Sequence, residues 1–296
     1  MAKQQRRRGL FGQTFDDADT EMVRLVKLTI RLARRHLTDY AHVKSPRKYT
    51  QPQLFACLIL KAHLDATYRR IEELLILMPA VREAIGLAEV PRFTTLQAFA
   101  DRPEIVTLMD GVLASIGRAV NKAQPQDAAI DGTGLETTSA SAHFMCRAGR
   151  KRVKYVKLTL AVLCSAMIPC ALVADWGPSA DMKQAWEVRA KLKASTKPTW
   201  LWGDGAYDCE AWHEANWNEW GVPSYAPTVI RRADGGVTGF YRQAFVQEVE
   251  GYGRRWAIET VNSAFKRVSG SVLRSRKEHT LFTEASLKVV AYAIKR

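Results

Sequence analysis

Two aspartates, Asp131 and Asp204, each follow a short apolar run and precede a glycine, in the segments AAIDGTG and LWGDGAYD. A carboxylate where a strand meets a glycine turn is exposed on one side and braced on the other, a common setting for chemistry in α/β proteins. Asp-Gly pairs also mark ordinary turns, so each aspartate alone fits both interpretations. Their recurrence at two strand ends makes them candidate catalytic residues.

A third acidic residue, Glu259, lies in the segment YGRRWAIETVNSAFKR. Tyr252 and Arg255 precede it by seven and four residues, and Lys266 follows it by seven. At about 100° per residue these positions fall within roughly 60° on a helix, so the four side chains share one face. A solvated i,i+4 pair between Arg255 and Glu259 is the structural alternative.

The elements around these residues follow an α/β order. Alternation and helical spacing predict strands at 128–135, 153–164 and 168–174, a helix at 181–192, a strand at 199–203, a helix at 208–220, a strand at 222–227 and a long helical pattern from about 254. Three strands followed by alternating helices and strands predict an α/β domain. The polar segment 121–127, with Pro125, suits a domain edge.

The charge of the chain favours a polyanionic partner. It carries 44 Lys and Arg against 30 Asp and Glu, a net charge of +14. Nucleic acid is the first candidate and an anionic membrane surface the second. No run of 18 apolar residues and no apolar signal core occur, which argues against the membrane, so a cytoplasmic, nucleoid-associated protein is expected.

Residues up to about 115 show helical spacing, so an all-helical N-terminal region is expected. We expect a helical DNA-binding region at 1–120 and a catalytic domain at 121–296. Arginines spread over the short helices suit a helix-turn-helix-like module, but they equally suit the outer face of an ordinary helical cap. These are Arg69, Arg70, Arg82, Arg92 and Arg102.

The basic run 147–157 lies between the first two expected strands and contains Arg150, Lys151 and Arg152. It suits a hairpin that contacts phosphates, and it also suits a solvated loop. Five scattered cysteines contain no C-x-x-C pair, and the six histidines show no ligand spacing. Neither a disulfide framework nor a zinc site is therefore indicated.

The set Tyr252-x2-Arg255-x3-Glu259-x6-Lys266 resembles the Y-x2-R-x3-E-x6-K signature of bacterial insertion-sequence transposases of the DDE type, in the superfamily around insertion sequences four and five. The segments at Asp131 and Asp204 resemble its two aspartate motifs. The resemblance covers roughly residues 50–290 and implies a ribonuclease-H-like catalytic domain with a mixed five-stranded sheet and flanking helices. Glu259 follows Asp204 by only 55 residues, which predicts a compact core without a large inserted β domain.

The resemblance implies that Asp131, Asp204 and Glu259 are catalytic and hold two divalent metal ions, Mg²⁺ or Mn²⁺, with Asp131 bridging both. Carboxylate oxygens suit these hard ions. By the same resemblance Tyr252, Arg255 and Lys266 contact DNA.

The implied activity is cleavage of DNA at element ends and joining of the 3′-hydroxyls to target DNA. The implied partners are double-stranded DNA, as terminal inverted repeats and as target, and a second copy of the chain in a homodimer on two ends. Two alternatives stay open: a metal-dependent nuclease of the same fold that joins nothing, and a catalytically silent DNA-binding descendant of a transposase.

Overall fold

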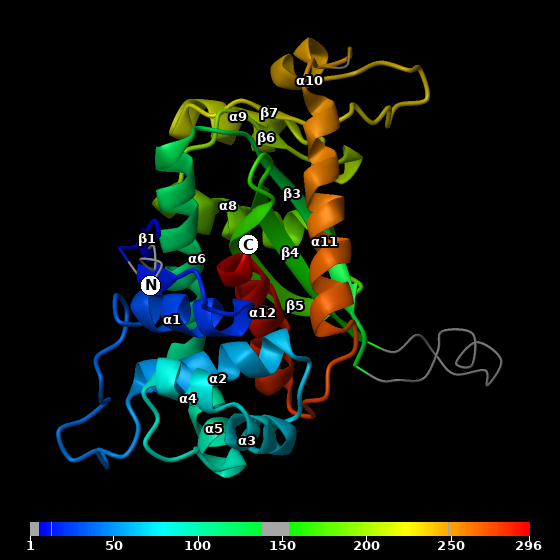
Figure 1. Ribbon diagram of the computed structural model, residues 1–296. Coiled ribbons are helices and arrows are strands. Elements are labelled where there is room, and N and C mark those ends of the chain that lie inside the picture. The colour runs from blue at the N-terminus through cyan, green and yellow to red at the C-terminus, as the bar shows by residue number, and fades with distance from the viewer. Residues whose placement is uncertain (1–5, 13, 138–153, 248) are drawn as a thin grey trace.

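The computed structural model describes residues 6–12, 14–137, 154–247 and 249–296, and its centre is a five-stranded mixed sheet (Figure 1). The strands are β3 (Ala128–Leu135), β4 (Tyr155–Leu163), β5 (Ile168–Gly177), β6 (Leu201–Trp202) and β7 (Ser224–Tyr225), in the spatial order β5-β4-β3-β6-β7. The first three are antiparallel, and β6 and β7 are added in parallel to β3. This confirms the expected α/β order and agrees with the ribonuclease-H-like arrangement that the resemblance implies.

Alternation along β3 separates the two faces of the sheet. Ala128 and Ile130 belong to a cluster with the helices α8 (Asp181–Ser195) and α9 (Glu210–Trp220). Ala129 belongs to the cluster on the other face, which includes α11 (Trp256–Ser269) and α12 (Glu278–Lys295). Because side chains alternate along a strand, Asp131 points to the same face as Ala129, toward α11.

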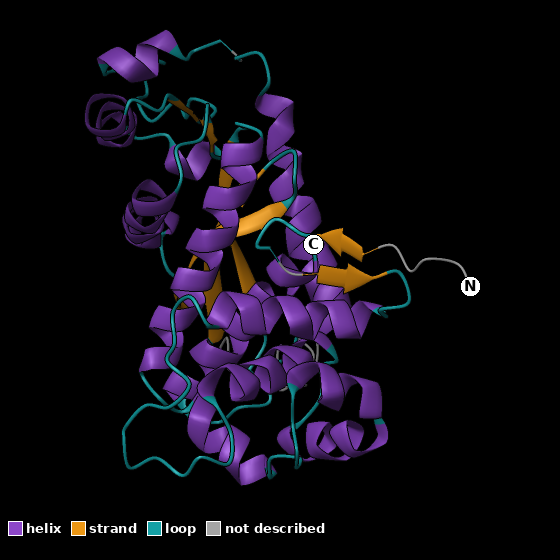
Figure 2. Ribbon diagram, turned by 60° about the vertical axis from the view of Figure 1, so that its left-hand side comes forward, coloured by secondary structure: helices purple, strands orange, loops and turns teal. Residues whose placement is uncertain are grey.

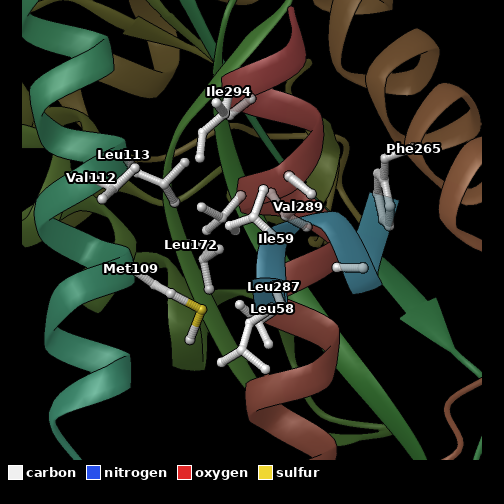
Figure 3. Packing of buried hydrophobic residues seen from close by; sticks show 14 of the residues in the cluster. Leu58, Ile59, Met109, Val112, Leu113, Leu172, Phe265, Leu287, Val289 and Ile294 are labelled. Carbon is white, nitrogen blue, oxygen red and sulfur yellow. The ribbon is translucent and has the colours of Figure 1, made fainter. Parts of the chain in front are cut away.

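Helix α12 lies at the centre of the larger hydrophobic core (Figure 3). It packs on β4 and β5 and is covered by α2 (Gln51–His63) and α6 (Glu104–Ala123). Leu58, Ile59, Leu287 and Val289 are at most 2% exposed. Burial of each such side chain contributes about 1.5–3 kcal/mol, so this layer fixes the N-terminal helices against the sheet.

The N-terminal region is mostly helical, with one departure from the expectation. Its helices are α1 (Glu21–Ala33), α2, α3 (Tyr68–Leu77), α4 (Pro79–Ile85), α5 (Phe93–Ala100) and α6. A short hairpin of β1 (Arg6–Arg8) and β2 (Thr14–Asp16) precedes them and is visible in Figure 2. Gly12 has a φ of 75° and its amide donates to the carbonyl of Gly9, which closes a turn that helical periodicity does not reveal.

The border expected at residue 120 falls in the last turn of α6, and one hydrophobic cluster joins α1 and α2 to the sheet. The division into two domains stays a prediction. In the parts of the chain that the structure describes, no helix is both long and apolar enough to cross a membrane.

Candidate active site

Asp131 and Asp204 are level with each other at the same edge of the sheet. The parallel pairing of β3 with β6 matches Ala129 to Trp202, and each aspartate comes two residues later. Neighbouring strands lie about 4.8 Å apart, so the register brings both carboxylates to one end of adjacent strands. The Asp204 carboxylate caps the 3₁₀-helix η1 (Gly205–Tyr207) by accepting the Ala206 amide at 2.9 Å.

The Asp131 carboxylate is partly buried, and its Oδ1 accepts the Gly132 amide at 2.8 Å. The pKa of Asp131 is raised to about 6, chiefly by burial and in smaller part by the carboxylates of Asp204 and Asp181, while the Gly132 amide and Arg255 oppose the rise. Asp131, Asp204 and Asp181 are called the acidic cluster below.

Glu259 is held by Arg255 and not by the aspartates. Nη2 of Arg255 donates a hydrogen bond to Oε1 of Glu259, one turn along α11. The Glu259 side chain is 58% exposed, whereas that of Arg255 is 20% exposed. Burial opposes the charge of Arg255, but Tyr252, Glu259, Asp131 and Asp204 together raise its pKa. The guanidinium therefore lies among all three predicted catalytic carboxylates.

Tyr252 lies before helix α11, and Lys266 lies in its C-terminal half. Tyr252 belongs to the 3₁₀-helix η2 (Tyr252–Arg255), which precedes α11, and its ring packs edge-on at 5.1 Å from that of Tyr225. Lys266 lies two turns beyond Glu259 on α11, where burial lowers its pKa while Glu136 and Asp131 oppose that effect. Lys266 is thus within electrostatic reach of Glu136 and Asp131. The predicted contacts Arg150, Lys151 and Arg152 lie outside the described residues.

Asp181 begins α8, a position that helix capping alone could explain, but the structure gives it another contact. The helix has no side-chain cap. Asp181 Oδ1 pairs with Nζ of Lys157 at 2.8 Å, and Lys157 also donates to the carbonyl of Ser179. A Cβ added at Gly132 would meet Asp181 Oδ1 at 2.8 Å, so the carboxylate approaches β3 next to Asp131 in the chain but from the face of the sheet that α8 covers. The available signal was Lys157, a charged residue in the apolar run YVKLTLAVL.

A second ion pair missed by sequence reasoning anchors the segment between β7 and α11. Asp208, 1% exposed, accepts hydrogen bonds from Nε and Nη2 of Arg242 at 2.8 Å each. Arg242 lies in the short helix α10 (Phe240–Ala244), at the top of Figure 1. An open groove of about 550 Å³ beside this pair also reaches Met182 and Ala206, which adjoin the acidic cluster.

The mixed sheet and the acidic strand ends define a class of α/β domain in which carboxylates converge at one edge. The chain belongs to the family described as the transposase DDE domain, whose model matches residues 122–294, more than half of the 296 residues. Comparison with curated proteins gave no match.

This family implies divalent metal ions, and the donor chemistry of the cluster suits them. Asp131, Asp204 and Asp181 offer carboxylate oxygens, the ligands that Mg²⁺ and Mn²⁺ prefer. The hydroxyl of Tyr207, whose side chain is fully buried, has no hydrogen-bond partner in the described residues, and burial and these same three carboxylates raise its pKa. Within the described ranges no three His, Cys, Asp or Glu side chains are already placed to hold one metal ion, and Glu259 accepts a hydrogen bond from Arg255.

Proposed function

We propose that the protein is a bacterial insertion-sequence transposase of the superfamily around insertion sequences four and five. It binds element ends, cleaves DNA phosphodiester bonds and joins the freed 3′-hydroxyl ends to target DNA, with Asp131, Asp204 and Glu259 as the catalytic carboxylates. The observation that carries the proposal is the level placement of Asp131 and Asp204 on adjacent parallel strands, with the helix of Glu259 over the same face. Membership of the transposase family supports it.

Each side chain has a defined task in this proposal. Asp131, Asp204 and Glu259 would hold two divalent ions, which supply an activated water and stabilise the leaving oxygen when bound. Asp131 must lose its proton to serve as a ligand, and Glu259 must leave Arg255. The released guanidinium, Lys266 and the Tyr252 hydroxyl then contact phosphates of the DNA end.

The test uses duplexes taken from the two ends of the DNA segment that encodes the chain. One substrate is intact and the other has a free 3′-hydroxyl at the element end. Wild-type protein with Mg²⁺ should cut the first and join the second to a plasmid, while Asp131→Asn and Asp204→Asn should reduce both reactions at least about a thousandfold, with DNA binding retained.

The outcomes separate the competing functions. Cutting without joining of the free 3′-hydroxyl end would identify a nuclease of the same fold. DNA binding with neither reaction, in Mg²⁺ and in Mn²⁺, would identify a silent DNA-binding protein. Reactions that persist in both aspartate variants would refute the assigned site.

The partners follow from the same proposal. Residues 1–120 would recognise terminal inverted repeats, and a homodimer would hold two ends together in the bacterial cytoplasm, at the nucleoid. Light scattering of the complex with an end duplex should give two chains and two duplexes. A complex of one chain with one duplex, under conditions that support joining, would contradict the dimer.

A further inference from the structure

A second pocket, of about 370 Å³, lies far along the chain from the acidic cluster, where the N-terminal helices meet the start of α12. Four cationic and two acidic residues occur in its lining. The residues that line it are Lys61, Thr67, Tyr68, Gln97, Asp101, Arg274, Ser275, Arg276, Lys277, Thr280 and Glu284. It therefore carries a surplus of positive charge.

Lys61 is the unusual member of this lining. It is 7% exposed, and its ammonium lies 4.5 Å from the centre of the Tyr68 ring. Among the described residues it makes no hydrogen bond and no ion pair. Burial lowers its pKa, while the charges of Glu284 and Asp65 oppose that effect. Lys61 borders the pocket, and its ammonium is not among the fully buried unpartnered polar atoms, so an anion in the pocket could pair with it.

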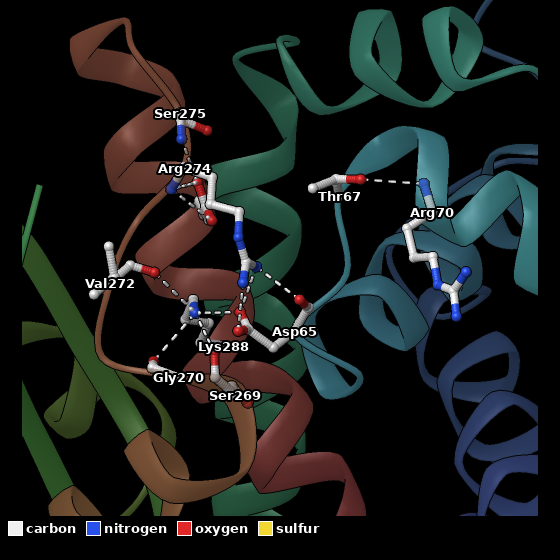
Figure 4. A network of polar contacts seen from close by, with 10 residues as sticks. Asp65, Thr67, Arg70, Ser269, Gly270, Val272, Arg274, Ser275 and Lys288 are labelled. Carbon is white, nitrogen blue, oxygen red and sulfur yellow. Dashed lines mark hydrogen bonds and ion pairs between the residues drawn. The ribbon is translucent and has the colours of Figure 1, made fainter. Parts of the chain in front are cut away.

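The neighbouring cations show how such a charge is satisfied elsewhere in this region (Figure 4). Lys288, 2% exposed, pairs with Asp65 at 3.0 Å and donates to the carbonyls of Ser269 and Gly270. Arg274 reaches both carboxylate oxygens of Asp65 at 2.7 Å. These two cations share the single carboxylate of Asp65, whereas Lys61 makes no ion pair in the described residues.

The acids of the lining are also largely committed. Both oxygens of Glu284 accept backbone amides, from Arg274 at 3.1–3.2 Å and from Ser275 at 2.8 Å. Asp101 is different: its buried Oδ1 accepts no hydrogen bond in the described residues and lies 4.0 Å from Nε2 of His279, so its negative charge offsets part of the positive charge of the lining. Helix α12, 18 residues long, starts in this lining at Lys277, and no side chain of its N-cap residue bonds its first amides, which leaves them able to bind an anion.

We infer that this pocket binds a phosphate group of the DNA backbone, held by Lys61, Arg276, Lys277 and the first amides of α12. The inference rests on the proposed DNA-binding function and adds a phosphate site remote from the reacting carboxylates. Helix α11 spans about 21 Å at 1.5 Å per residue and leads from Arg255 to the loop that precedes α12. That span is shorter than one turn of duplex, about 34 Å, so one DNA segment can reach both ends.

The experiment measures binding of a fluorescent end duplex in EDTA, so that no cleavage is required. Lys61→Met keeps the buried stem and removes the charge, and Arg276→Gln with Lys277→Gln removes exposed charges that no core packing needs. Each variant should bind roughly tenfold more weakly, and the slope of log K against log salt should fall by about one for each phosphate that is no longer bound. Lys48→Gln, an exposed lysine already paired with Glu89, is the matched control and should bind like wild type.

A second arm titrates inorganic phosphate against the thermal unfolding of wild type and Lys61→Met. Phosphate should stabilise the wild type and compete with DNA, and it should do neither in the variant. Phosphate stabilisation with unchanged DNA affinity in all pocket variants would overturn the DNA assignment in favour of a free-anion site. Unchanged DNA affinity and no response to phosphate would overturn the site altogether. If the pocket variants weaken DNA binding as expected but the wild type does not cleave DNA with Mg²⁺, only the proposed catalytic function is refuted.

Discussion

Arg255 donates to Glu259 across one helical turn, and the same guanidinium is within electrostatic reach of Asp131 and Asp204. A positive charge therefore already lies among the three carboxylates. Under the proposed function, a divalent ion bound there would compete with Arg255 for Glu259.

Replacing Arg255 by Gln should tighten divalent-ion binding. Loss of the competing charge frees Glu259, and an ion pair of this exposure is worth up to about 1 kcal/mol, so Mn²⁺ affinity should rise roughly threefold to fivefold. Titration calorimetry with Mn²⁺ measures this change. Affinity for an end duplex should fall in the same variant, because the guanidinium can no longer bind a phosphate.

The control for this experiment is Arg267→Gln, an exposed arginine on the same helix. It removes the same charge without freeing Glu259 and should leave Mn²⁺ affinity close to that of wild type. Equal gains in the two variants would show that general charge and not the Arg255–Glu259 pair governs metal binding.

Asp131→Asn should stabilise the fold at neutral pH. With a pKa of about 6, against about 3.9 ordinarily, folded Asp131 holds its proton more tightly than the unfolded chain does. That contribution is complete at acid pH and is lost as the pH rises through about 6. Because Asn stays neutral, the variant should gain up to about 3 kcal/mol at pH 7.5 and little at pH 3.5, measured by urea unfolding. Asp39→Asn, at an exposed aspartate, should show no such difference.

Asp208→Asn should loosen the segment between β7 and α11. The change leaves the buried Arg242 without its carboxylate, a loss that typically costs about 3 kcal/mol. Trypsin should then cut faster after Arg231 and Arg232, and mass spectrometry of the fragments measures the rate. The control is Asp234→Asn, which removes an exposed ion pair with Arg232 in the same segment and should leave the cutting rate unchanged. Equal acceleration in both variants would show that the local charge, and not the buried pair, controls cutting by trypsin.

Sequence periodicity was sufficient to predict the strands that carry or precede the two aspartates. β3 is residues 128–135 as expected, and the apolar runs before Asp131 and Asp204 give two strands that pair directly. The sharing of one helix face by Arg255, Glu259 and Lys266 also follows from spacing. Local pattern fixes these features because each depends on residues within one strand or helix.

Contacts between residues far apart in the sequence could not be predicted from local sequence patterns. Asp208 pairs with Arg242, 34 positions later, and no local pattern connects them. The helical pattern that starts near residue 254 gave no sign that Gly270, with a φ of 73°, would separate α11 from α12. Asp65 lies against that glycine from the far N-terminal region, where a Cβ would meet its carboxylate at 2.8 Å.

The pair of Lys157 and Asp181 allows a double-mutant test of the fourth carboxylate at the site. The Lys157 side chain is 6% exposed and that of Asp181 is 33% exposed. Loss of the partner should therefore cost more stability when it leaves Lys157 unpaired than when it leaves Asp181 unpaired. Asp181→Asn leaves a buried ammonium with only the Ser179 carbonyl and should cost about 2–3 kcal/mol. Lys157→Met leaves a carboxylate that water still reaches and should cost about 1 kcal/mol.

The double variant should be more stable than the sum of the single losses predicts, with a coupling of about 1–2 kcal/mol in urea unfolding. Arg70→Met with Glu73→Gln, an exposed i,i+3 pair on helix α3, is the control and should show coupling below about 0.5 kcal/mol. Strict additivity for Lys157 and Asp181 would mean that the ion pair does not hold Asp181 against β3. If the two residues are coupled, and the double variant recovers stability but does not cleave DNA, then the reaction needs the charge of Asp181.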